Sequence, residues 1–231
     1  MTKSISILEY LKRTFILVGL IFLVLIVQLP VQYMALNKHL AIGNIVIGSV
    51  VYLAGFALAI WLALKAYRSV FTQTNHGLNK SDWKLIGKAL LLFYVVEIGL
   101  SSLNMLLYKQ SGTENNEIIF SLVKSNPIVL ILMSFTMVFC SPILEELVFR
   151  GYLIKGLLPK SKRIIAMLVS GILFSIGHAS STPVSFLIYM SLGMILAYIY
   201  LKQDKIEVSM GLHFLNNLIA TIIMVLTVLA G

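Results

Sequence analysis

Residues 14–37 read TFILVGLIFLVLIVQLPVQYMALN, a run without a charged side chain between Arg13 and Lys38. A helix needs about 20 predominantly apolar residues to cross the hydrocarbon core of a bilayer. The run is too long for the apolar core of a secretory signal peptide, and no small-residue cleavage site follows it. We therefore expect an uncleaved first membrane span here.

The composition of the whole chain agrees with a membrane protein. Hydrophobic residues make up 59% of the 231 residues and charged residues 12%, with a mean hydropathy of +0.95. Soluble domains are about half apolar and about a quarter charged, so lipid is the solvent for most of this surface. The net charge of +9 comes from basic residues beside apolar runs, which suits anionic lipid headgroups. We expect the lipid bilayer, and no nucleic acid, among its partners.

Further apolar runs predict spans near residues 40–64, 85–108, 126–140, 164–178, 183–201 and 208–230. Pro127 and Pro142 each predict a break or kink, because proline lacks a backbone donor, and we expect a separate or bent helix over 143–158. The fold class is thus all-α, a polytopic membrane helical bundle of seven transmembrane helices, or eight if both prolines separate spans. No polar insert divides the chain, so residues 1–231 form one membrane domain.

Basic residues are unevenly shared between alternate loops. They gather at the N-terminus and in segments 65–84, 155–163 and 202–205, whereas the other loops hold only Lys38, Lys109 and Lys124. Short loops rich in Lys and Arg stay in the cytoplasm. We expect a multi-pass protein of the cell membrane with a cytoplasmic N-terminus.

An acidic cluster lies in the predicted helix after Pro142. Ionisable groups inside spans are costly and need an explanation. Glu146 and Arg150 are four residues apart, so they share a helix face and neutralise one another. Glu145 points elsewhere without an intrahelical cation, which suits a general base, although a static ion-pair cluster of all three residues is the simpler alternative.

Two histidines occupy later spans. Phe174 precedes His178 by four residues and can limit rotation of the imidazole, and His213 shares a helix face with Asn217. Each group alone also fits interior hydrogen bonding between helices. If the helices before and after Ser161 form an antiparallel hairpin, Glu145 and His178 reach a similar depth. A common depth with His213 then requires that hairpin to project into the cytoplasm.

These residues, in this order and spacing, resemble the three-motif signature of the CPBP membrane proteases. That family includes the type II CAAX prenyl endopeptidases and bacterial Abi and bacteriocin-immunity relatives. The motifs are Glu145-Glu146-x-x-x-Arg150, Phe174-x-x-x-His178 and His213-x-x-x-Asn217. They place a motif-bearing catalytic core at about residues 126–231.

The resemblance implies a glutamate-dependent endopeptidase without metal or other cofactor, acting on a membrane-associated peptide or protein. By motif position, Glu145 and His178 activate the attacking water, and His213 and Asn217 stabilise the oxyanion. Glu146 and Arg150 support the site, with Phe174 beside the histidine. The sequence names neither the peptide cleaved, whether prenylated, leader, pheromone or bacteriocin, nor the oligomeric state.

Three other functions fit the residues. A zinc peptidase would use the two histidines with glutamates, but there is no His-Glu-x-x-His motif. A bacteriocin-immunity protein or proton-coupled transporter would use the ionisable groups, together with Lys88 and Glu97 of the third span, without catalysis. A haem protein would use His178 and His213 as axial ligands.

Overall fold

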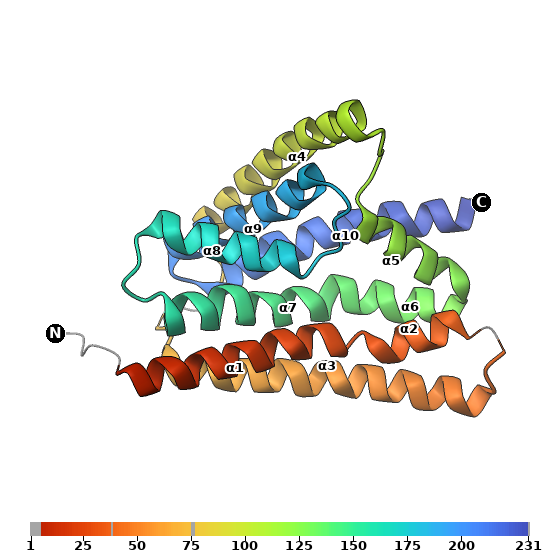
Figure 1. Cartoon of the computed structure of the whole chain (residues 1–231), viewed down its shortest axis with the longest axis horizontal. Helices are drawn as coiled ribbons and strands as arrows, with labels where there is room; N and C mark the ends of the chain where they lie inside the picture. The colour runs from red at the N-terminus through yellow and green to blue at the C-terminus, as the bar shows by residue number, and fades with distance from the viewer. Residues whose placement is uncertain (1–5, 38, 75–76, 231) are drawn as a thin grey trace.

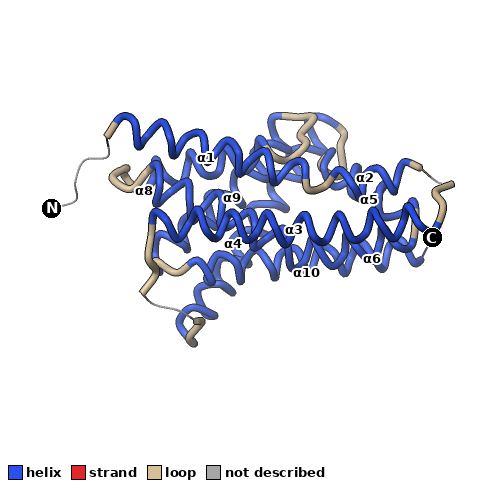
Figure 2. Tube along the Cα trace, turned by 90° about the horizontal axis from the view of Figure 1, so that it is seen from below, coloured by secondary structure: helices blue, strands red, loops and turns tan. Residues whose placement is uncertain are grey.

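The computed structural model describes residues 6–37, 39–74 and 77–230, and all regular structure in these ranges is helical. The predicted all-α class is therefore confirmed (Figure 2). Lys3 and Lys38, which enter the charge count, lie outside the described residues. In chain order the helices are α1 (Ile7–Ile26), α2 (Leu29–Leu36), α3 (Ile42–Val70), α4 (Lys80–Tyr108), α5 (Glu114–Ser125), α6 (Pro127–Phe135), η1 (Thr136–Cys140), α7 (Ser141–Glu146), η2 (Leu147–Leu157), α8 (Arg163–Ile176), α9 (Pro183–Gln203) and α10 (Ile206–Ala230).

Six helical segments among the described residues are long and apolar enough to cross a membrane. They cover residues 7–36, 42–70, 80–108, 127–157, 183–203 and 206–230. The seventh predicted span corresponds to α8, whose 14 residues extend only about 21 Å against a hydrocarbon core of about 30 Å. The polytopic bundle is confirmed, and the count by length is one lower than predicted.

The chain does not break at Pro142. Segments α6, η1, α7 and η2 follow one another without interruption from Pro127 to Leu157 (Figure 1). The five-residue π-helical turn η1 precedes the proline and contains Val138, whose carbonyl would clash with the proline ring in a regular α-helix. The widened turn lets the helix continue, so of the two forms predicted for 143–158 the separate helix is excluded. The predicted break at Pro127 is confirmed, since α5 ends at Ser125.

The segments rich in basic residues meet at one end of the bundle, opposite the C-terminus (Figure 1). Lys155 forms an ion pair with Asp204, Arg13 Nη1 donates to the Gly156 carbonyl over 2.9 Å, and Lys205 Nζ lies 2.9 Å from Asp82 Oδ2. These contacts join α1, the end of η2, the α9–α10 turn and the start of α4. The segments that the charge pattern assigned to one side of the membrane therefore lie together at one end of the folded bundle.

Helices α8 and α9 form a tightly packed hairpin beneath α4. A Cβ added to Gly193 of α9 would lie 2.8 Å from the Cα of Gly171 in α8, so only glycine permits this approach. Helix α4 covers the other side of α9. The hairpin loop is held by α4, since Thr182 Oγ1 donates to Asn104 Oδ1 over 2.7 Å. These contacts fix the position of His178 at the end of α8.

Candidate active site

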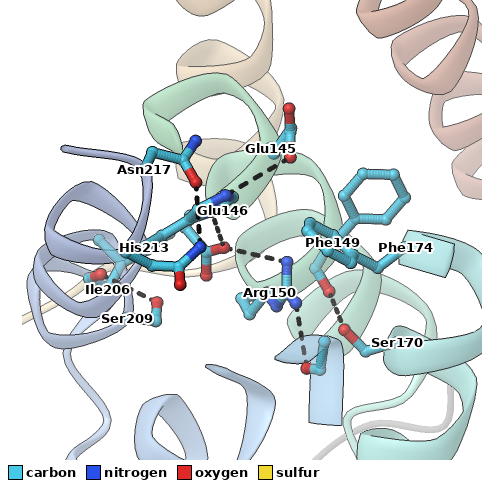
Figure 3. A network of polar contacts seen from close by, with 12 residues as sticks. Glu145, Glu146, Phe149, Arg150, Ser170, Phe174, Ile206, Ser209, His213 and Asn217 are labelled. Carbon is cyan, nitrogen blue, oxygen red and sulfur yellow. Dashed lines mark hydrogen bonds and ion pairs between the residues drawn. The ribbon is translucent and has the colours of Figure 1, made fainter. Parts of the chain in front are cut away.

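A buried ion pair lies at the centre of the site. Arg150 Nη1 donates to Glu146 Oε1 over 2.9 Å, and both side chains are 0% exposed. Arg150 Nη2 donates to the Gly193 carbonyl over 3.0 Å, and the guanidinium carbon lies 4.5 Å from the centre of the Phe174 ring. The predicted pairing across one helical turn is confirmed (Figure 3).

His213 enters this network from α10. Its Nδ1 donates to the same Glu146 oxygen over 2.9 Å, and the ring is buried. A carboxylate on one ring nitrogen fixes the orientation of the imidazole and leaves the other nitrogen for chemistry. Glu146 therefore lies between Arg150 and His213 and holds both in place (Figure 3).

Glu145 faces the free side of His213. Its Oε2 lies 3.8 Å from His213 Nε2, which is too long for a hydrogen bond. This oxygen is buried and makes no hydrogen bond with any described residue. At a separation above 3.5 Å, a water molecule beside the two atoms can contact both of them. As predicted, Glu145 makes no ion pair with Arg150, and its partner comes from α10.

His178 is held between two aromatic rings. Its ring centre lies 4.5 Å from that of Phe174 and 4.4 Å from that of Tyr189, with an interplanar angle of 20° to the tyrosine. His178 Nδ1 donates to the Phe174 carbonyl over 2.8 Å, because a carbonyl only accepts. In the neutral imidazole, Nε2 then carries the lone pair. The predicted contact between Phe174 and His178 is confirmed.

The structure brings the two histidines to the same aromatic ring but does not join them directly. Phe174 lies 5.6 Å from His213 and 4.5 Å from His178, measured between ring centres. Within the described ranges, no hydrogen bond or ion pair links His178 to Glu145. The first and third motifs thus form one polar network, with the second motif packed against it.

Asn217 makes a structural contact. Its Nδ2 donates to the Met137 carbonyl over 2.9 Å, and its Oδ1 accepts from Asn216 Nδ2 over 3.3 Å. Met137 lies in η1, where the π-helical turn alters the normal backbone pairing. A primary amide has two N–H groups, so one donor of Asn217 remains beyond the bond to Met137.

Sequence reasoning missed two residues of the site. The Tyr189 hydroxyl pairs with Thr113 Oγ1 over 2.7 Å and donates to Asn116 Oδ1 over 3.2 Å, so the start of α5 positions the ring on His178. No spacing pattern marks that contact. Gly193 supplies the carbonyl for Arg150, and small residues within apolar spans are a general signal of close helix packing. Glu97 lies on α4, outside the network.

Among the described residues, no group of three His, Cys, Asp or Glu side chains is arranged to hold a metal ion. The arrangement present is instead a carboxylate opposite an oriented imidazole. Such a pair can bind a water molecule and move its proton.

Comparison with known proteins identifies the same part of the chain. Residues 127–219 match the family model described as type II CAAX prenyl endopeptidase Rce1-like. The Bacillus subtilis strain 168 protein named "Putative membrane peptidase YdiL" is 30% identical over 105 residues, which cover 46% of this chain and 41% of that protein. "Uncharacterized protein YyaK" of the same strain is 24% identical over 192 residues, covering 76% of this chain and 59% of that protein.

The chain thus spans about two fifths and three fifths of the length of these two relatives. No solved structure matches it at a significant level. The matched segment contains all seven residues of the three motifs and the helices that carry them, from α6 to the first half of α10. The segment that carries the three motifs is thus similar to the type II CAAX prenyl endopeptidases, as the resemblance of the motifs predicted.

Proposed function

We propose that this protein is an intramembrane endopeptidase in which Glu145 is the general base. The observation that carries the proposal is the 3.8 Å separation between Glu145 Oε2 and His213 Nε2. Glu145 Oε2 is buried without a hydrogen bond from the described residues, and Glu146 fixes the orientation of the His213 imidazole. A water molecule between them would be oriented by both groups.

The proposed reaction is hydrolysis of a peptide bond. Glu145 takes a proton from the water as its oxygen attacks the carbonyl carbon, and the carbonyl oxygen becomes an oxyanion. His213, in its doubly protonated form with Nδ1–H on Glu146 and Nε2–H free, and Asn217, through its second N–H, are proposed to donate to that oxyanion. Nε2 of His178 provides a second contact for the water. When the C–N bond breaks, Glu145 returns the proton to the leaving amine. A positioned base contributes about 10²–10⁴-fold, and one oxyanion donor about 10²–10³-fold.

The surroundings of the site favour a substrate with an apolar segment. A cavity of about 270 Å³ lies between the α7 and α10 sides, and apart from Glu207 its lining is apolar, including Pro142, Ile143 and Phe214. Pro142 and Phe214 lie within one helical turn of Glu145 and His213 on their respective helices. We infer that the substrate is a membrane-associated peptide or protein whose apolar residues occupy this cavity beside the scissile bond.

Comparative peptidomics tests this function on all the peptides of a membrane at once, so that no substrate has to be chosen beforehand. Membranes containing the wild-type protein are compared with membranes containing Glu145→Ala or Glu97→Gln. The proposal predicts cleavage products with the wild type and with Glu97→Gln, and their loss with Glu145→Ala. A proton-coupled transporter predicts no difference in peptides. Identical peptide profiles for wild type and Glu145→Ala would reject the peptidase.

Chelation separates the glutamate mechanism from a zinc peptidase. Once a cleaved peptide is known, its hydrolysis is measured after exhaustive treatment with EDTA and phenanthroline. The glutamate mechanism predicts an unchanged rate. Loss of activity that returns on addition of zinc would establish the metallopeptidase instead.

We further propose that the end of the bundle with the basic segments faces the cytoplasm, which places the N-terminus there. Single cysteines at Lys124 and Lys160, both exposed and at opposite ends of the 127–157 span, test this in a Cys140→Ser background. A membrane-impermeant thiol reagent should reach Lys160→Cys only from the cytoplasmic side and Lys124→Cys only from the opposite side. Labelling of both from one side would contradict this topology.

A further inference from the structure

A second cavity, lined in part by charged residues, lies away from the candidate active site, between the start of α1 and the end of α3. Its volume is about 370 Å³, at the lower end of the range for small-ligand pockets. Three cations line it, from Lys12 and Arg13 on α1 and from Lys65 on α3, together with the single carboxylate of Glu9. The cavity therefore has an excess of positive charge.

The cations differ in what they already bind. Arg13 Nε donates to Glu9 Oε1 over 2.9 Å, and its Nη1 donates to the Gly156 carbonyl over 2.9 Å. Lys65 lies 5.2 Å from the centre of the Trp61 ring. Neither Lys12 nor Lys65 makes a hydrogen bond or ion pair with a described residue, so both ammonium groups are available to an anion.

A buried hydroxyl completes the lining. Tyr152 of η2 is 0% exposed, and its hydroxyl makes no hydrogen bond with any described residue. A buried polar group without a partner is costly. Since this residue lines the cavity, a ligand there is the candidate acceptor for its hydroxyl proton. Two free ammonium groups and a hydroxyl donor around one space are a recognition site for a phosphate group.

We propose that this cavity binds the phosphate headgroup of an anionic phospholipid. Its position between two membrane helices, at the end of the bundle where the basic segments gather, matches the headgroup layer. The bound lipid would bridge α1, α3 and η2. Because η2 also carries Arg150, the lipid would fasten the helix of the candidate active site to the N-terminal helices.

The test measures lipid binding to the purified full-length chain, by native mass spectrometry and by melting temperature. Phosphatidylglycerol is compared with phosphatidylcholine of the same acyl chains and with inorganic phosphate. A hydrogen bond to a charged group contributes at least about tenfold, so Lys12→Gln/Lys65→Gln should weaken phosphatidylglycerol binding at least about tenfold. Tyr152→Phe should weaken it at least about tenfold, since a bond to a charged group is lost.

The matched control is Lys160→Gln/Lys162→Gln, which removes two cations from the neighbouring η2–α8 turn outside the cavity. It should bind phosphatidylglycerol like the wild type. Without anionic lipid, Tyr152→Phe should melt no lower than the wild type, because it removes an unpaired hydroxyl. Wild-type binding by both cavity variants, or an equal loss in the control, would overturn the proposal. Equal affinity for inorganic phosphate would likewise overturn the lipid as ligand.

Discussion

Two Glu–Arg ion pairs of this protein allow the contribution of a buried ion pair to stability to be compared with that of a more exposed one. Glu146–Arg150 and Glu9–Arg13 have the same spacing along a helix and the same N–O distance of 2.9 Å. Both side chains of the first pair are 0% exposed, whereas those of the second are 40% and 19% exposed for Glu9 and Arg13. Burial distinguishes them, together with the further bond that Glu146 accepts from His213.

Glu146→Ala should destabilise the protein by about 3–5 kcal/mol, the usual effect of leaving one charge of a buried pair uncompensated. Among the described residues, Arg150 would retain the Gly193 carbonyl and the Phe174 ring but no bound carboxylate, and His213 would lose its Nδ1 acceptor. Glu9→Ala should show no measurable loss, because water replaces an exposed partner.

The free energy of unfolding can be measured by SDS titration of the helical protein in mixed micelles without anionic lipid. The double variant Glu146→Met/Arg150→Met should recover much of the loss, since apolar residues of similar volume often replace a buried pair without penalty. If Glu146→Ala were no more damaging than Glu9→Ala, the idea that this ion pair supports the site would be refuted.

Three further predictions concern the surrounding side chains. Asn217→Ala should lower kcat and kcat/KM together by about 10²–10³ with little change in KM; preserved turnover per folded molecule with a lower melting temperature would leave it only a structural role. Tyr189→Leu should reduce kcat more than Tyr189→Phe, which keeps the ring on His178, and equal rates in a steady-state assay would remove this positioning role. Gly193→Val should lower the melting temperature strongly because its Cβ would overlap α8, whereas Gly99→Val, with no atom within 4 Å of its Cβ, should change it little.

Local patterns predicted those features of the site that depend on one helix. The spacing of Glu146 and Arg150 gave the ion pair, and that of Phe174 and His178 gave the ring contact. The structure also brings His213 to the level of Glu145, with 3.8 Å between their Nε2 and Oε2 atoms, while the projection of the hairpin into the cytoplasm stays a prediction. Leu157 lies 12 residues after Glu145, and Ile206 lies 7 before His213, so η2 extends further toward that end than α10 does.

Contacts between helices were beyond sequence reasoning. The approach of His213 to both glutamates depends on how α10 packs against α7, and the stacking of Tyr189 depends on the start of α5. The chain does not break at Pro142, because the proline rule assumes a regular α-helix and a π-helical turn has no clear sequence signal. The bond from Asn217 to Met137 arises from that same turn.

The central claim is that Glu145 activates water opposite His213. Its most direct test is the turnover of Glu145→Gln, which retains the size of the side chain and removes the base. On a peptide identified by peptidomics, purified protein should lose about 10²–10⁴-fold in kcat while keeping the wild-type melting temperature. Cleavage by Glu145→Gln at the wild-type rate would contradict the claim.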